Sequence, residues 1–118
     1  MSTITVTNIK ATGETASRSA TSVAAAWAKV NGTGTPSILD SVNFSSLTDT
    51  GTGNYSLTLT NSFTSTNIST CAGQFSDAGG TNAIYASATT SIILQFFSSS
   101  NVITDGLNLS ALAHGDLA

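Results

Sequence analysis

Charged residues are scarce in this 118-residue chain, at 8% against roughly 25% in an ordinary soluble domain. The only strong cations, Lys10, Arg18 and Lys29, form no basic cluster that would neutralise a run of phosphates. We therefore expect no nucleic-acid partner. A net charge of -3 carried by so few charges also gives weak repulsion between copies, which a protein tolerates when neighbours bury much of its surface. The composition favours oligomerisation.

Cysteine and long hydrophobic runs are lacking too. The single cysteine, Cys71, excludes an intrachain disulfide and a cysteine metal cluster, and we expect it to be a small buried hydrophobe. The longest apolar stretch, residues 83–97, is interrupted by Ser, Thr and Gln and is shorter than the roughly 20 residues of a membrane span. No membrane insertion is expected. The first residues show no basic region followed by an apolar one, which predicts synthesis in a cytoplasm without secretion.

Few side chains could carry catalysis. His114 is the only histidine, and a triad made from it, Asp116 and one of the many serines is a pattern of almost no specificity. A lone histidine near a terminus usually faces solvent or caps a strand or turn. The alternative is that three copies of His114 meet on a symmetry axis and bind a metal ion. The other acidic residues are scattered, mostly beside glycines as turn residues are: Glu14, Asp40, Asp49, Asp77 and Asp105. We expect no enzyme, and no catalytic, cofactor-binding or metal-binding residues.

Serine and threonine, in contrast, make up about a third of the chain, beside 40% hydrophobic residues and a mean hydropathy of +0.20. In many short segments hydroxyl and apolar side chains alternate, which is the period of a half-buried strand. Tyr55, Leu57 and Leu59 give the clearest case, because only polar residues stand between them. We expect strands near residues 2–9, 23–30, 38–44, 55–60, 67–74, 83–89, 91–97 and 107–112.

Turn signals separate these segments. Residues 31–36, Asn-Gly-Thr-Gly-Thr-Pro, predict a chain reversal, and residues 45–54 are interpreted as a hairpin loop. Residues 23–30 are ambiguous, because a run of alanines favours helix whereas Val23, Trp27 and Val30 suit a strand. A strand, or a short helical turn leading into one, is expected there.

The fold class expected is all-β: an antiparallel β-sandwich or barrel-like domain of about six to eight short strands. It would span residues 23–118, with residues 1–22 as an extended N-terminal arm. Residues 92–97, Ile-Ile-Leu-Gln-Phe-Phe, are apolar on both faces of a strand. Either the strand is central in one domain, or a neighbouring subunit covers its outer face.

Two stretches resemble a recurrent C-terminal domain of bacteriophage tail-fibre and tail-tip proteins. They are Ala-Trp-Ala-Lys-Val-Asn-Gly-Thr-Gly at residues 26–34 and Ser-Leu-Thr-Asp-Thr-Gly-Thr-Gly-Asn-Tyr-Ser-Leu at residues 46–57. Residues 108–116 are also similar to the last strand of that family. The residues that carry the motif are interpreted as fold residues: Trp27, Gly32, Gly34, Asp49, Gly51, Gly53 and Tyr55. The resemblance implies the distal end of a homotrimeric appendage.

The function expected is that of a virion structural protein: a tail fibre or receptor-binding appendage that contacts the host cell surface. Its partners would be copies of itself, other tail or virion proteins, and a bacterial surface glycan or outer-membrane protein. A loop rich in polar and aromatic residues is the candidate for receptor contact, through Gln74, Asp77, Asn82 and Tyr85. A phage head fibre or capsid decoration protein, whose N-terminal arm would grip the capsid shell, is the alternative. A secreted carbohydrate-binding module and a hydrolase are less favoured.

Overall fold

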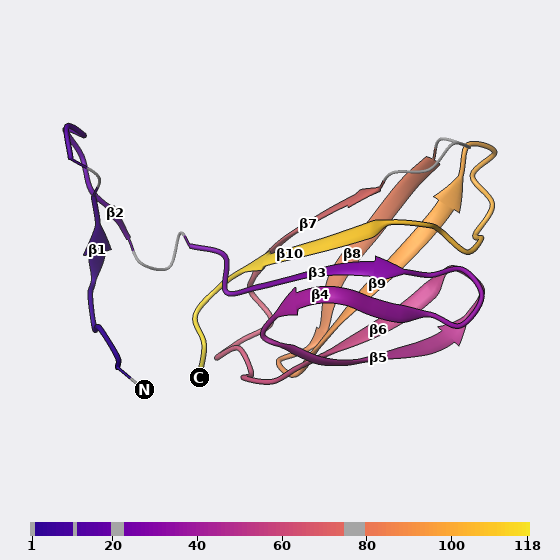
Figure 1. Cartoon of the computed structure of the whole chain (residues 1–118), viewed down its shortest axis with the longest axis horizontal. Coiled ribbons are helices and arrows are strands. Elements are labelled where there is room, and N and C mark those ends of the chain that lie inside the picture. Colours follow the sequence, from indigo (N-terminus) through magenta and orange to yellow (C-terminus); the bar gives the residue numbers. More distant parts are fainter. Residues whose placement is uncertain (1, 11, 20–22, 75–79) are drawn as a thin grey trace.

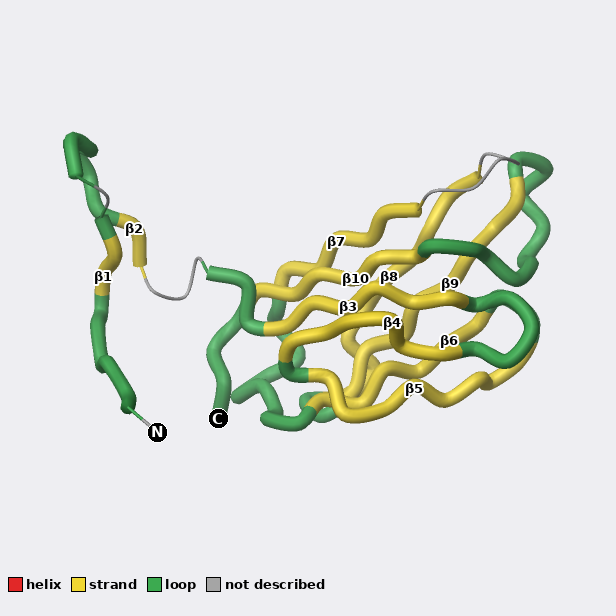
Figure 2. Tube along the Cα trace, in the orientation of Figure 1, coloured by secondary structure: helices red, strands yellow, loops and turns green. Residues whose placement is uncertain are grey.

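The computed structural model describes residues 2–10, 12–19, 23–74 and 80–118. These residues form strands and loops with no helix (Figure 2), so the expectation of an all-β fold is confirmed and that of a helical turn before residue 30 is not met. Two four-stranded antiparallel sheets face one another as in a β-sandwich, and β1 (Asn8–Ile9) and β2 (Arg18–Ser19) pair with each other outside them (Figure 1).

The order of strands brings distant segments of the chain together. The first sheet has the order β4-β3-β10-β7, from strands β4 (Ser37–Val42), β3 (Ala26–Asn31), β10 (Leu109–His114) and β7 (Ser69–Gln74). The second has the order β5-β6-β9-β8, from strands β5 (Phe44–Gly51), β6 (Asn54–Leu59), β9 (Ser91–Ser98) and β8 (Gly80–Ala88). The chain passes from one sheet to the other at Asn43, whose positive φ of 64° suits an asparagine at a sharp bend.

The core fills the space between the two sheets, and its residues follow the strand period. The buried set on the four central strands is Ala26, Ala28, Val30, Tyr55, Leu57, Leu59, Ile92, Leu94, Phe96, Leu109, Ala111 and Ala113. Alanines dominate on β3 and β10, whereas the second sheet contributes leucine, isoleucine and aromatic side chains. Small residues opposite large ones let the two faces interdigitate at native packing density. The alternation expected for Tyr55, Leu57 and Leu59 is confirmed.

Two strand assignments made from the sequence were wrong. Residues 45–54 are not a hairpin loop, because β5 continues to Gly51 and pairs with β6. The polar composition there belongs to an exposed edge strand, on which threonines serve as well as apolar residues. Near the N-terminus the strand is confined to β1, and Ile4 is 86% exposed rather than half-buried.

Strand β9 is apolar on both faces because it lies inside the second sheet. It pairs with β6 on one side and with β8 on the other. Leu94 on its inner face is fully buried, whereas Ile93 and Phe97 on its outer face are partly buried. This position fits the interpretation as a central strand of one domain.

Candidate functional site

The Tyr55 side chain joins three loops at one end of the sandwich. Its hydroxyl lies 2.9 Å from the carbonyl oxygen of Gly32 and 3.1 Å from Oδ1 of Asp105, so its single proton is donated to one of these acceptors. The same Asp105 oxygen accepts a 2.7 Å hydrogen bond from the backbone N–H of Gly53. The backbone N–H of Gly32 in turn donates to the Gly106 carbonyl at 2.9 Å. Segments far apart in the sequence, such as those around residues 32 and 106, are thereby fixed to one another.

Burial accounts for the chemistry of this phenol. Tyr55 has no exposed surface, and burial raises its pKa from 10.0 to about 12, with the hydrogen bond to the Asp105 carboxylate adding to the increase. The hydroxyl therefore stays protonated as a donor. Gly32 and Gly53 have no room for a side chain: a Cβ on Gly32 would collide with the Tyr55 ring, and one on Gly53 with the backbone of Thr104. The arrangement is a structural clamp and offers no access for a substrate.

The other motif residues lie in turns or on the surface. Asp49 accepts a 3.0 Å hydrogen bond from the backbone N–H of Gly51, and Gly51 and Gly34 have φ values of 140° and 67°. Trp27 is different, since it lies on β3 between the buried residues Ala26 and Ala28 and therefore points away from the core. The outer face of the first sheet around Trp27 is the most promising surface of the described residues.

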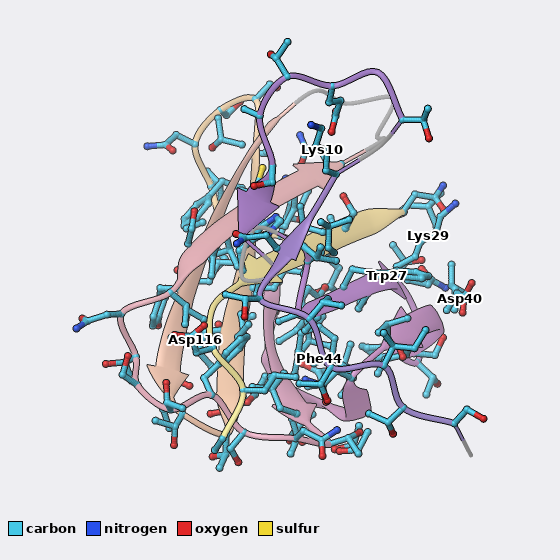
Figure 3. All side chains as sticks on the ribbon, turned by 90° about the vertical axis from the view of Figure 1, so that its left-hand side faces the viewer. Lys10, Trp27, Lys29, Asp40, Phe44 and Asp116 are labelled. Carbon is cyan, nitrogen blue, oxygen red and sulfur yellow. The ribbon has the colours of Figure 1, made fainter. Side chains whose placement is uncertain are left out.

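Register across the first sheet places two rows of side chains on that outer face. In one row Trp27 lies between Val42 of β4 and Leu112 of β10, and Cys71 of β7 follows Leu112. This row is mainly apolar. The second row consists of Asp40, Lys29, Ser110 and Gly73 in the same strand order. Figure 3 shows Trp27, Lys29 and Asp40 gathered on one side of the molecule.

A groove of about 780 Å³ opens over β3, β10 and β7. The residues that line it are Trp27, Ala28, Lys29, Cys71, Ala72, Gly73, Gln74, Asn108, Ser110, Ala111 and Leu112. At Gly73 the lining has no room for a side chain, because a Cβ there would lie 2.8 Å from Oγ of Ser110. We name this surface the Trp27 groove.

The Trp27 groove has an uneven distribution of charge. Among the residues that the structure describes, Lys29 is the only charged one in its lining. Asp40 stands opposite Lys29 in the register of β3 and β4, but its carboxylate accepts a 2.9 Å hydrogen bond from the backbone N–H of Ser41. The ammonium group of Lys29 is therefore the charge that a ligand in the groove would meet, with the Asp40 carboxylate on the neighbouring strand.

The residues expected to form a receptor-contact loop do not share one surface. Gln74 lines the Trp27 groove, whereas Asn82 pairs with Phe96 and thus faces the inside of the second sheet. Tyr85 is 48% exposed on the outer face of that second sheet. Asp77 lies outside the described residues. Oδ1 of Asn82 and Oε1 of Gln74 are buried without a hydrogen-bond partner in the described part of the chain.

The expectation of a buried Cys71 is wrong. Cys71 is exposed at the Trp27 groove and is not a buried hydrophobe, because its position on β7 falls on the outer face beside Leu112. His114 is partly buried at the end of β10, opposite Ser69. Within residues 2–10, 12–19, 23–74 and 80–118, no three His, Cys, Asp or Glu side chains gather closely enough to hold a metal ion. In the same ranges no helix is long and apolar enough to cross a membrane.

The sequence analysis named Gln74 as a candidate contact residue and Trp27 only as a fold residue, and it missed the rest of the groove. Ser110 and Leu112 occupy outward positions of β10, alternating with the buried Leu109 and Ala111. The strand period indicates that they share a face. It does not indicate that β10 lies between β3 and β7, which is what brings Cys71 to them.

Comparison of the chain with protein-family models, with curated proteins and with solved structures gave no match.

Proposed function

We propose that this protein is a structural component of a bacteriophage virion, a tail fibre or receptor-binding appendage that contacts the host cell surface as a homotrimer. The observation that carries the proposal is the clamp at Tyr55. The two stretches that resemble the tail-fibre domain contribute Gly32 and Tyr55, which are 23 residues apart and meet in a buried hydrogen bond. The two halves of the motif thus pack together as one structural unit, which supports the proposal.

The character of the surface supports display on a particle. Hydroxyl groups, more than charges, cover the strands: on the exposed edge strand β5 one residue in eight is charged, namely Asp49. Its partner edge in the first sheet, β4, exposes Leu39 and Val42. Open edges with apolar side chains and few charges suit packing against further subunits. Weak contacts with a host receptor would be multiplied by the copies in such an assembly.

Two measurements test the proposal. Sedimentation of the purified protein should give the mass of a trimer, and a stable monomer would contradict the homotrimer. Antibodies against the protein should label the tail of intact particles and block their adsorption to host cells. Labelling of the head alone would support the alternative, a head fibre or decoration protein, and labelling of neither would end the virion assignment.

A further inference from the structure

We propose that the Trp27 groove is a saccharide-binding site, in which the indole of Trp27 covers the apolar face of a sugar ring. The proposal rests on the receptor-binding function proposed above and names the class of ligand. The proposal starts from the orientation of Trp27. This side chain lies between two buried residues of β3, so it points away from the core, and it is only partly buried.

The first argument is the chemical character of the lining. Trp27 and Leu112 are neighbours across β3 and β10 and provide an apolar wall. The face of an aromatic ring carries negative potential, which attracts the slightly positive C–H groups of a sugar. A sugar ring has such an apolar face and a rim of hydroxyls, so it needs an apolar wall with polar groups around it.

The second argument is that the polar groups needed for that rim are present and unused. Lys29, Asn108 and Ser110 line the groove, and their side chains make no hydrogen bond to any described residue. The same holds for the indole N–H of Trp27 within the described ranges. These groups offer both donors and acceptors, as hydroxyl recognition requires.

The third argument is size. A volume of about 780 Å³ lies within the range of roughly 300–1,000 Å³ typical of small-ligand sites. The lining comprises 11 residues, fewer than the roughly 20–30 per side of a stable protein interface. A short saccharide therefore fits the groove better than a second copy of this chain does.

The charge of Lys29 narrows the class of saccharide that the groove should prefer. Because Lys29 is the only charged residue that the described part of the chain contributes to the lining, an acidic sugar should bind better than its neutral counterpart. An exposed ion pair contributes about 0.2–1 kcal/mol, so the preference should be roughly twofold to fivefold.

The single tryptophan makes the test direct, since all indole fluorescence comes from Trp27. The full-length protein is titrated with glucose, galactose, N-acetylglucosamine and glucuronate. At least one sugar should change the fluorescence in a saturable way, with Kd on the order of millimolar as expected for a small open site. Glucuronate should bind more tightly than glucose, and Lys29→Met should remove that difference. Titrations without saturation for every sugar would overturn the proposal.

A blocking variant separates binding at the groove from binding elsewhere. Ser110→Leu fills the floor of the groove on an exposed position and keeps the Trp27 reporter, so the response should be lost while the unfolding midpoint changes little. Ser56→Leu, at an outward position of β6 in the other sheet, is the matched control and should respond as the wild type does. An unchanged response of Ser110→Leu would contradict the site.

Cys71 supplies a second, independent readout. Its thiol is exposed at the rim and is the only one in the chain, so its rate of reaction with a maleimide should fall when a sugar occupies the groove. Protection that depends on protein concentration and not on sugar would instead identify an interface between copies and overturn the proposal. Failure here together with tail labelling by antibodies would refute the saccharide site and leave the proposed function standing.

Discussion

Replacing Tyr55 by phenylalanine tests whether the clamp holds the sandwich together. The change removes one hydroxyl from a fully buried ring and leaves the ring itself in place. With the hydroxyl proton in the shorter contact, at 2.9 Å, the Gly32 carbonyl loses its donor, and the Asp105 carboxylate loses a 3.1 Å contact. Asp105 is exposed and regains water, whereas Gly32 is buried and its carbonyl does not. The cost is that of a buried unsatisfied acceptor, about 1–3 kcal/mol.

We therefore expect Tyr55→Phe to lower the free energy of unfolding by about 2 kcal/mol, and Tm by roughly 8 °C. A denaturant titration monitored by Trp27 fluorescence measures the free energy of unfolding. Tyr85→Phe is the matched control, because the only other tyrosine is 48% exposed and its hydroxyl has no partner in the described part of the chain. Equal midpoints for Tyr55→Phe and Tyr85→Phe would refute the reasoning.

The same clamp predicts a loss of stability in alkali. Because the pKa of Tyr55 rises from 10.0 to about 12 on folding, its contribution is complete below pH 10 and is lost as pH rises through 12. A difference of two units corresponds to about 3 kcal/mol. Wild type and Tyr85→Phe should lose this amount between pH 10 and 12, and Tyr55→Phe should not. Parallel pH profiles for all three proteins would contradict the assignment.

Two further pairs of substitutions test the fold. Gly53→Ala should destabilise the protein by at least about 3 kcal/mol, because the residue has φ of 61° and a Cβ there would meet the Thr104 backbone. Gly34→Ala, at a similar φ of 67° but in open space, should cost about 1 kcal/mol. Equal unfolding midpoints for these two variants would show that the contact with Thr104 is irrelevant. Leu94→Ala should cost about 2–5 kcal/mol, since the side chain is fully buried. Ile93→Ala, at the neighbouring position on the partly covered outer face of β9, should cost about 1 kcal/mol. Thermal unfolding of both variants measures the difference, and a reversed order would mean that the two faces are assigned wrongly.

The alternation of side chains was sufficient to predict the central strands. In β6 every second residue is large and apolar, so the sequence pattern alone defines which face is buried, whereas in β9, which is apolar on both faces, the pattern predicted a strand but left its inner face open. Edge strand β5 was not predictable in that way, because much of it is exposed and Thr48 and Thr50 resemble loop residues. The turn at residues 31–36 was correctly placed, as its glycines and proline are signals that act locally.

The site was much less accessible to sequence reasoning than the fold. Asp105 reaches Tyr55 from 50 residues away, and no local pattern contains that contact. Cys71 was expected to be buried because free cysteine usually is, but residue type does not reveal which face of an edge strand a position occupies. The contact of Asp105 with Tyr55 depends on how distant segments are arranged, and the exposure of Cys71 depends on its register with Leu112 of β10; neither is contained in a local pattern.

On strand β3 the residues of the core and those of the proposed binding site lie on opposite faces. Ala26, Ala28 and Val30 face the core and are buried, whereas Trp27 and Lys29 between them face the groove. Because successive side chains of a strand point to opposite faces, one face of β3 can change its side chains without disturbing the packing of the other. Substitutions at Trp27 or Lys29 should accordingly alter recognition at small cost in stability, whereas a larger residue at Ala28 should strain the core. A scaffold of this kind can keep its clamp and core while the outer face of one sheet adapts to a different ligand.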